Sequence, residues 1–286
     1  MTANTDSLVE APLGASDLAG AQALVEQAGW NQSAADWRIF LDLGQGIAVK
    51  DADGRLAATA ATLPYPSGFG WISMVLVAQA FRRRGIATRL LEHCVAALRA
   101  SGMVPVLDAT PAGREVYKPL GFRDGWPIQR WRRTDSVPAL RTAPPVRALE
   151  DGDWLALLQL DLAAFGCDRG PLLSRLRERC KGFACVAGAG GRLRGFLLGR
   201  EGRIATQLGP IVAEDEDTAA ALAAWAGARL EPPVIVDALE RHDRFSRWLA
   251  ANGFAKERPY TRMALGRDEL FGDPRRMVAI AGPELG

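Results

Sequence analysis

The sequence of 286 residues predicts an α/β protein built from two copies of one unit. The first observation is a repeated order of elements, because in each half a capped helix precedes a hairpin, an apolar strand and a second helix. The second is a Gly-Phe pair at matching positions, Gly121-Phe122 and Gly253-Phe254. The third is a proline-containing stretch without periodicity between the halves. We therefore expect domains at 1–137 and 146–286, joined by a linker at 138–145.

In the first half, apolar spacing and turn residues predict each element in order. A helix is expected at 15–29, because Leu18, Ala21, Leu24 and Val25 share one face after a Ser16 or Asp17 cap. The remaining predicted elements are a hairpin around Asp53-Gly54, a buried strand GWISMVLVA at 70–78, a helix with an apolar stripe that stops at Gly102, a strand VPVLDA at 104–109, a short helix that ends before Gly121-Phe122, and a strand that returns to Arg133.

The second half repeats this order. The predicted elements are a capped helix from Asp151 to Phe165, a helix from Pro171, a hairpin around AGAGGR, an apolar strand ending in GPIV, a helix in DTAAALAAWAGARL, a strand in PVIVDAL, a short helix in RFSRWLAANGF and a closing strand.

Composition excludes several classes of protein. A formal charge of +2, from 35 basic and 33 acidic residues, provides no global attraction to nucleic acid or to anionic membranes. No run of about 18 apolar residues occurs, and the N-terminus does not resemble a signal peptide. Four scattered cysteines and two histidines support neither disulfides nor a metal site. We expect a cytoplasmic protein without nucleic-acid or membrane partners, and the sequence leaves its oligomeric state open.

The segment FRRRGIATRLL, at 81–91, carries the strongest functional signal. A polyphosphate ligand needs convergent backbone N–H groups, space for its oxygens and positive charge. The segment supplies the charge through three arginines and the space through Gly85 and Ala87, directly before a helix whose first amides have no intrahelical acceptor. A strand before it and an amphipathic helix after it make the Arg-x-x-Gly-x-Ala spacing informative.

Two other interpretations of these arginines remain. A basic turn on an ordinary surface helix would oppose the positive end of the helix dipole, so it costs stability unless an anion lies there. A nucleic-acid patch would also draw on QRWRR at 129–133. The near-neutral total charge and the lack of aromatic residues within the run argue against that patch.

Together, VLVAQAFRRRGIATRLL and VLDATPAGREVYKPLGF resemble the GNAT superfamily of acyl-CoA-dependent N-acyltransferases. In that family the pyrophosphate of coenzyme A is bound by a short motif between a strand and a helix. The motif is (Gln/Arg)-x-x-Gly-x-(Gly/Ala). The resemblance covers residues 8–133. The second half, with LDLAAFGCDRGPLLSRL, QLGPIVAED and GFAKERPYTRM, is similar to the YitH-like two-domain subgroup. The resemblance implies tandem α+β folds, each a mixed, mostly antiparallel sheet flanked by helices.

The resemblance also implies roles for matching residues and implies acetyl-CoA as cofactor. Tyr117 would be the general acid. The main chain of four strand residues would pair with the pantetheine arm. The amides of the following turn, together with the hydroxyl of Thr88, would bind the pyrophosphate. These coenzyme residues are Met74, Val75, Leu76 and Val77 for the arm, and Arg82, Arg83, Arg84, Gly85, Ile86, Ala87 and Thr88 for the pyrophosphate.

Chemistry supports a general acid independently. When an amine attacks a thioester, negative charge develops on the carbonyl oxygen and then on the departing sulfur, so an N–H near Val77 and a hydroxyl donor lower both barriers. Tyr117 can alternatively pack its ring on the sheet as a structural residue. The base is not determined: Asp108, Glu115, Asp161 and Asp168 are carboxylates that also suit capping or surface positions, and His93 suits partial packing within its helix.

The second half departs from the family pattern where chemistry is expected. It has GPIVAEDEDTAA in place of RRRGIA, and its acidic residues would repel a pyrophosphate. Leu249 stands four residues before Gly253, where Tyr117 stands four before Gly121. We expect this half to wall the acceptor site rather than to bind coenzyme. The candidate acceptor residues are Trp30, Asn31, Asp108, Phe165, Asp168, Arg169 and Tyr260, with Arg258 and Arg262 beside them; an internal ion pair of Arg169 and a core position for Trp30 are the alternatives.

The sequence thus favours an N-acetyltransferase that moves an acetyl group from acetyl-CoA to the primary amine of a small molecule or amino acid. A protein-lysine acetyltransferase is the nearest alternative. A non-catalytic acyl-CoA sensor or scaffold is an alternative of another class, because a fold and a motif do not guarantee activity. Acceptor identity and acyl length are left open.

Overall fold

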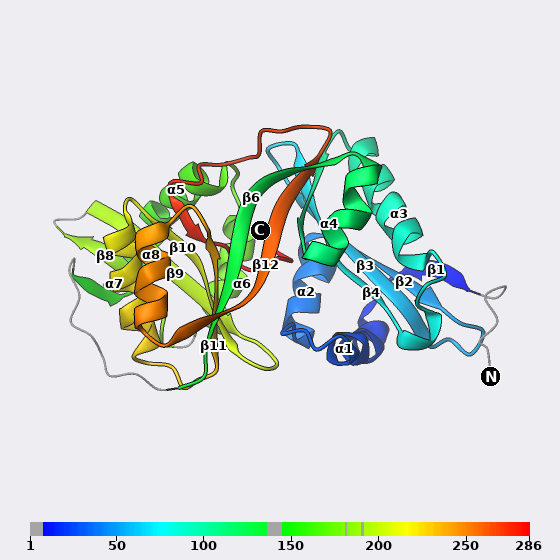
Figure 1. Ribbon diagram of the computed structural model, residues 1–286, viewed down its shortest axis with the longest axis horizontal. Helices are drawn as coiled ribbons and strands as arrows, with labels where there is room; N and C mark the ends of the chain where they lie inside the picture. Colours follow the sequence, from blue (N-terminus) through cyan, green and yellow to red (C-terminus); the bar gives the residue numbers. More distant parts are fainter. Residues whose placement is uncertain (1–7, 136–144, 181, 190–191) are drawn as a thin grey trace. The chain divides into compact units, whose positions relative to one another are not determined.

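The computed structural model describes residues 8–135, 145–180, 182–189 and 192–286 (Figure 1). The chain forms two compact units that do not coincide with the two sequence halves. The first unit comprises the chain up to Val106 together with Gly202–Ile204, and the second comprises 107–201 and 205–286. The division precedes strand β6 (Phe122–Arg133) because β6 pairs with strands of the second half, β11 (Val234–Leu239) and β12 (Phe254–Leu265). The predicted linker lies outside the described residues except for Pro145.

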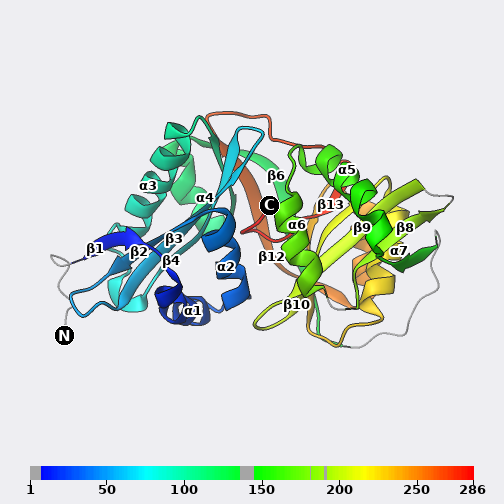
Figure 2. The same cartoon turned by 180° about the vertical axis from the view of Figure 1, so that it is seen from behind.

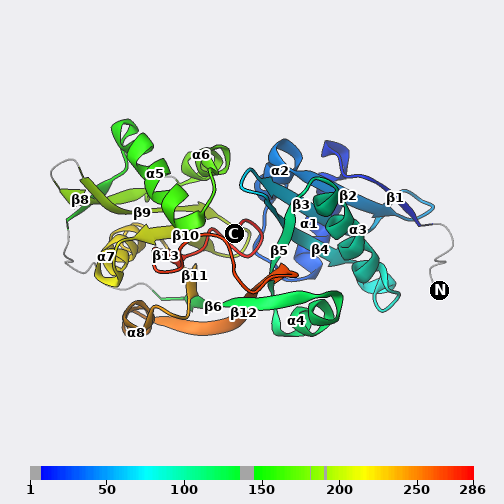
Figure 3. The same cartoon turned by 90° about the horizontal axis from the view of Figure 1, so that it is seen from above.

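The first unit is a mostly antiparallel sheet in the order β1-β2-β3-β4, with β5 parallel to β4. Helices α1 and α2 lie on one face and α3 lies on the other (Figure 3). The bounds are β1 (Val9–Pro12), β2 (Gln45–Lys50), β3 (Leu56–Tyr65), β4 (Phe69–Val77), β5 (Val104–Ala109), α1 (Leu18–Gln27), α2 (Ala34–Leu43) and α3 (Ile86–Ala100), with 3-10 turns η2 (Ala15–Asp17) and η3 (Gln79–Phe81).

The local signals explain most of these elements. The β2–β3 hairpin turns at Gly54, whose φ of +77° needs a residue without Cβ. Asp51 Oδ1 stabilises this turn by accepting hydrogen bonds from the amides of Asp53 (3.0 Å) and Arg55 (2.9 Å). In α3 the apolar stripe through Leu90 and Cys94 is fully buried against the sheet. The hairpin, strands and helix expected over this region are confirmed.

Helix α2 is not among the elements predicted from the sequence. Ser33 and Asp36 form a capping box in which the Ser33 amide donates to Asp36 Oδ2 at 2.7 Å. Trp37 and Phe40 follow at helical spacing and are fully buried, with ring centroids 6.2 Å apart. The signal was therefore present as Ser-x-x-Asp before an apolar pair.

The second unit has the strand order β12-β6-β11-β13-β10-β9-β8-β7. Helices α7 and α8 lie on one face of its sheet (Figure 1), and α5 and α6 lie on the other (Figure 2). The bounds are α4 (Pro111–Tyr117), η4 (Lys118–Leu120), β7 (Val146–Ala148), η5 (Asp151–Asp153), α5 (Trp154–Phe165), α6 (Gly170–Arg179), β8 (Cys185–Ala189), β9 (Arg192–Glu201), β10 (Thr206–Ala213), α7 (Glu216–Gly227), α8 (Asp243–Ala251) and β13 (Met277–Ala279).

Strand β13, also unexpected, enters the sheet between β10 and β11. These two strands pair in parallel only from Thr206↔Val234 to Leu208↔Val236. Beyond that point β13 pairs with both of them, through Ile211↔Ala279 and Ala238↔Ala279. The amide of Ile280 then donates to the Asp237 carbonyl at 3.0 Å, so the strand closes the gap.

The core of the second unit is apolar on the side of α7 and α8. Trp131, Phe183, Leu197 and Phe245 are among its buried members. All four cysteines of the chain are buried and free of disulfides. Within the described ranges, no helix is long and apolar enough to cross a bilayer.

Candidate active site

Strand β4 has one free edge over the residues expected to hold the coenzyme arm. Its pairing with β5 ends at Trp71↔Val106, whereas its pairing with β3 continues to Val77↔Ala58. Opposite Thr59–Ala61 the β3–β4 register shifts, and Met74 adopts a left-handed φ of +54°. Thr59 Oγ1 donates to the Met74 carbonyl at 3.0 Å and fixes this bulge. Backbone groups of 75–77 can therefore pair with an extended ligand along the free edge.

The turn after β4 has the backbone of an anion cradle. Arg83 has φ +61° and Gly85 has φ +73°, so left-handed residues alternate with ordinary ones just before α3. Such alternation turns successive N–H groups toward one point. The Gly85 carbonyl accepts the amide of Arg89 at 3.0 Å, so the amides of Ile86 to Thr88 form the first turn of the helix and have no intrahelical acceptor. The site residues expected here thus form one continuous turn.

Space for a ligand lies directly above Gly85. A Cβ built on this residue would meet no atom within 4 Å. Arg82, Arg83 and Ala87 beside it are exposed. The turn therefore fits a pyrophosphate, because it combines open space, unpaired helix amides and positive side chains.

Two of the three arginines also brace the turn. Arg82 Nε donates to the Val77 carbonyl at 3.1 Å, and Arg84 Nη2 donates to the Ala80 carbonyl at 2.9 Å. The Arg84 guanidinium lies 5.5 Å from the centroid of the Phe81 ring. Among the described residues, neither Arg82 nor Arg83 forms an ion pair with a carboxylate. Their positive charge is thus left for an external anion.

Tyr117 belongs to the second unit, at the end of α4. Its ring packs on Gly113 and lies 6.0 Å, centroid to centroid, from the Phe122 ring. The side chain is half-buried, and this burial raises the pKa of the Tyr117 hydroxyl above its ordinary value of 10.0. The phenol is therefore protonated at neutral pH, as a proton donor must be.

Arg169, a candidate for acceptor binding, has an internal role. It donates Nε to Asp161 Oδ2 (2.8 Å) and Nη2 to Asp161 Oδ1 (2.9 Å), and Nη1 donates to the Gly286 carbonyl (2.7 Å). Its guanidinium lies 3.8 Å from the centroid of the Phe165 ring. All three side chains are buried. Arg169 is therefore in an internal ion pair, but its partner is Asp161 and not the adjacent Asp168. Arg169, Phe165 and Asp161 do not fit the acceptor or base roles.

The other candidate carboxylates are also engaged. Asp108 is buried and forms a two-bond pair with Arg262, at 2.9 Å for each bond; burial raises the pKa of Asp108, and the guanidinium opposes that rise. Asp168 Oδ1 accepts the Gly170 amide at 2.8 Å at the start of α6. Glu115 is exposed. No carboxylate among these is left free and buried, as a general base would be.

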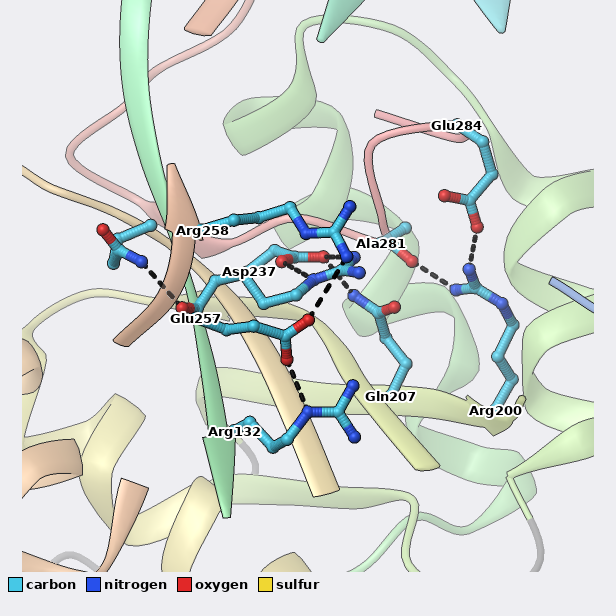
Figure 4. Close-up of polar contacts among 10 residues, drawn as sticks. Arg132, Arg200, Gln207, Asp237, Glu257, Arg258, Ala281 and Glu284 are labelled. Carbon is cyan, nitrogen blue, oxygen red and sulfur yellow. Dashed lines mark hydrogen bonds and ion pairs between the residues drawn. The ribbon is translucent and has the colours of Figure 1, made fainter. Parts of the chain in front are cut away.

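Tyr260 lies in a buried polar row across the second unit. Its ring lies 5.3 Å from the guanidinium of Arg130, and burial raises the pKa of its hydroxyl. Arg130 forms two bonds of 2.7 Å to Asp237, which also accepts Gln207 Nε2 at 2.6 Å. Figure 4 shows this row and its neighbours: Arg200 reaches Ala281 and Glu284 at one end, and Glu257 contacts Arg132 and Arg258 at the other. The contacts of Asp237 with Arg130 and Gln207 join β11 to β6 and β10, and the Arg132–Glu257 pair joins β6 to β12.

Trp30 and Asn31 are held by a segment distant in sequence. The Asn31 carbonyl accepts the Arg203 amide at 2.7 Å, and Asn31 Oδ1 accepts the Ile204 amide at 3.0 Å. Arg203 Nε donates to the Trp30 carbonyl at 3.0 Å. Asn31 is buried and Trp30 is half-exposed. The loop is therefore fixed within the first unit, and the polar atoms of Asn31 are used there.

His93 of α3 contacts an acidic residue of β1. Its Nδ1 lies 3.2 Å from Glu10, which also accepts Arg89 Nε at 2.7 Å. Glu10 and His93 border a pocket of about 490 Å³ whose walls include Leu13, Ile47 and Cys94. Burial raises the pKa of the Cys94 thiol to about 12, so the thiol is unreactive. His93 thus has a surface role.

Both halves of the chain match models of acetyltransferase families. Residues 19–122 match the model of the acetyltransferase (GNAT) family, and residues 157–278 match a second model, an acetyltransferase (GNAT) domain. A curated relative, the uncharacterized N-acetyltransferase YitH of Bacillus subtilis, is 23% identical over 242 residues, which are 84% of this chain and 85% of the relative. The chain belongs to the GNAT acyltransferases and carries two GNAT domains in tandem.

Solved structures share the fold. A putative acetyltransferase from Pyrococcus horikoshii has a TM-score of 0.82 at 18% identity, covering 99% of this chain and 97% of its own. A GCN5-related N-acetyltransferase from Sphaerobacter thermophilus has a TM-score of 0.69 at 19% identity, covering 93% and 98%. A tandem GNAT protein from the clavulanic acid biosynthesis pathway has a TM-score of 0.65 at 15% identity, covering 92% and 100%. The predicted tandem α+β fold is thereby confirmed.

Proposed function

We propose that this acyltransferase uses acetyl-CoA and that the first domain alone binds it. The observation that carries the proposal is the turn at 82–88, where open space over left-handed Gly85 meets unpaired helix amides and two arginines without ion pairs. GNAT proteins act on acyl-CoA and an acceptor, and this turn is the feature that fits the diphosphate. Bound acetyl-CoA supplies an acetyl thioester that an amine can attack.

The residues proposed to hold the coenzyme have complementary tasks. Main-chain groups of Met74 to Val77 bind the extended arm as an added strand would bind, along the free edge of β4. Amides of Arg82 to Ala87 and the Thr88 hydroxyl bind the pyrophosphate. The Thr59–Met74 hydrogen bond fixes the bulge in this strand, and an N–H near Val77 is proposed to stabilise negative charge on the thioester oxygen.

Tyr117 is the proposed general acid. A C–N bond forms from the nitrogen lone pair, the C–S bond breaks, and the Tyr117 hydroxyl donates its proton to the departing sulfur. The nitrogen loses one proton to solvent, and the phenolate regains one from solvent. Because its pKa is raised, the Tyr117 hydroxyl is protonated at neutral pH and can donate.

The acceptor is proposed to be the primary amine of a small molecule or amino acid, with the second domain walling its site. Most of the acceptor candidates have partners within the chain. These are Arg169, Phe165, Asp108, Asn31, Tyr260 and Asp168. The protein-lysine acceptor and the non-catalytic sensor stay as alternatives, and we expect the chain to act in the cytoplasm without nucleic-acid partners.

The second domain is proposed not to bind coenzyme. The gap between β10 and β11, which corresponds to the free edge of β4, is filled by β13. The helix that follows β10 starts with the acidic residues Glu216 and Asp217 and is capped by Asp215, which accepts the Thr218 amide at 2.8 Å. Both features oppose an incoming diphosphate.

The test is thiol release from acetyl-CoA across a panel of amines and amino acids. We expect turnover with at least one small primary amine. Binding of CoA by calorimetry without turnover on any acceptor would instead support the sensor. Absence of CoA binding would overturn the proposal.

A further inference from the structure

A buried hydroxyl without a partner lies beside the proposed thioester site. Ser73 precedes the bulge residue Met74 in β4, and its Oγ is buried with no hydrogen-bond partner among the described residues. A buried polar atom that lacks a partner costs stability. In a strand otherwise composed of apolar residues, alanine would fill the same place without that cost, so a partner from outside the chain is the physical explanation to test.

The direction of the Ser73 side chain follows from the register of β4. Gly70 faces α3, because a Cβ built on it would lie 2.3 Å from Leu98 of that helix. Residues alternate faces along a strand, and the register is regular up to Ser73↔Ala61. Ser73 therefore points away from α3, to the face where α2 lies (Figure 3).

The position of Ser73 along the strand places it at the start of the free edge. The last pair with β5 is Trp71↔Val106, two residues earlier. A ligand arm that pairs with 74–77 lies in the plane of the sheet, so its carbonyl plane is close to that plane. A nucleophile attacks a carbonyl from above or below its plane. Ser73 is on one of these two sides, whereas the backbone N–H groups lie in the plane.

None of the four candidate carboxylates competes for this role. Asp108, Asp161 and Asp168 are engaged in the contacts described above, and Glu115 is exposed. A neutral hydroxyl accepts a hydrogen bond from an amine N–H without being ionised, since its oxygen has two lone pairs. This matches an oxygen that is buried and lacks a donor.

We propose that Ser73 is a substrate-positioning residue: its Oγ accepts a hydrogen bond from the acceptor amine and directs the nitrogen lone pair at the thioester carbon. The inference rests on the proposed function and adds a contact for the nucleophile. No bond to Ser73 forms or breaks, and the amine proton leaves to solvent as before. The acceptor is therefore an amine with at least one N–H left to donate during attack, either primary or secondary, and a tertiary amine is excluded.

The experiment compares Ser73→Ala with Ser73→Thr, which keeps the hydroxyl, and with Ser101→Ala, whose hydroxyl donates to the Ala97 carbonyl at 3.2 Å on the exposed end of α3. For Ser73→Ala we expect kcat/KM for the amine to fall roughly 10- to 100-fold. We expect CoA affinity within about twofold of the wild type, and a melting temperature equal to or above that of the wild type. Ser73→Thr should recover part of the loss, and Ser101→Ala should match the wild type.

The pH profile provides a second readout. A hydroxyl that only accepts a hydrogen bond does not titrate, so Ser73→Ala should lower the rate by the same factor at every pH. Unchanged kcat/KM in Ser73→Ala, or a loss that follows a parallel loss of CoA affinity or of stability, would overturn the role of Ser73 while leaving the proposed function intact. Absence of turnover by the wild type with every amine would overturn both.

Discussion

Gly85 combines two demands that only glycine meets. Its φ of +73° disfavours any side chain, and the space above it is where we propose the pyrophosphate to bind. Gly102 provides a natural comparison, because it has φ +70° at the other end of α3 and also has no atom within 4 Å of a built Cβ.

We therefore expect Gly85→Ala and Gly102→Ala to lose a similar free energy of unfolding, about 1–2 kcal/mol for a left-handed alanine. Only Gly85→Ala should weaken CoA binding, by roughly tenfold or more, because its methyl group occupies ligand space. Denaturant unfolding and calorimetry measure the two effects. Equal CoA affinity in both variants would place the coenzyme elsewhere.

The hydroxyl of Tyr117 can be removed with little change in packing, since the ring contacts Gly113 and Phe122. Tyr117→Phe should lower kcat about 10²- to 10⁴-fold and leave CoA affinity nearly unchanged. A parallel loss of affinity would contradict the general-acid role.

The same residue predicts a pH dependence. The acid works in its protonated form, and burial raises its pKa above the ordinary value of 10.0. The protonated form therefore persists to higher pH than in a free phenol, and turnover should not lose this group below about pH 10. A descending limb near neutral pH that disappears in Tyr117→Phe would show that the assignment is wrong.

At the residue scale, the sequence predicts a motif of consecutive residues but does not predict a contact between distant residues. Arg82 to Thr88 are consecutive, so the sequence alone predicted one turn, and the structure has it. Arg169 was a candidate for acceptor binding, with an internal ion pair as the alternative. The sequence around it does not show that its guanidinium donates to Gly286, 117 residues further along the chain. Ser73 had a signal, as the polar residue of an apolar strand, but its lack of a partner is a property of the folded chain.

At the scale of elements, the connection from α5 to α6 depends on one buried ion pair. Asp161 of α5 and Arg169 before α6 are almost fully buried. Removing one partner of such a pair leaves an uncompensated buried charge.

Asp161→Asn should therefore lose about 3–5 kcal/mol of the free energy of unfolding. Asp168→Asn is the matched control: its side chain accepts the Gly170 amide at an exposed helix start, where asparagine serves equally well. Denaturant unfolding of both variants tests this. Similar stability of the two would mean that the pair adds nothing.

The strands that the sequence does not predict are all short. Strands β1, β7 and β13 have only three or four residues, too few to show alternation. They exist because longer strands offer them edges, as β10 and β11 do for β13. Helix α2, in contrast, has a capping signal in the sequence, Ser33-x-x-Asp36, followed by apolar residues at helical spacing.

At the scale of the whole molecule, two related domains are proposed to bind one coenzyme. The free edge of β4 has no counterpart in the second domain, where β13 occupies the corresponding gap. We expect calorimetry to give one CoA per chain and Gly85→Ala to weaken that single binding step by the factor given above. A stoichiometry of two, or a binding step of wild-type affinity that survives in Gly85→Ala, would mean that the second domain retains a site.

The division of the chain into units differs from its division into halves. Strand β6, encoded in the first half, pairs with β11 and β12, and Gly202–Ile204, encoded in the second half, belongs to the first unit. A sequence pattern cannot reveal such an exchange, because each half contains a full set of predicted elements.

This exchange of strands determines how fragments of the chain would behave when they are expressed separately. Expression of 1–137 alone would leave β6 without its neighbours, and expression of 146–286 alone would expose the facing edges of β11 and β12, so each fragment would be prone to aggregate. Co-produced in one cell, the same fragments have reciprocal edges to cover, which makes this chain a natural candidate for a split enzyme that assembles by complementation.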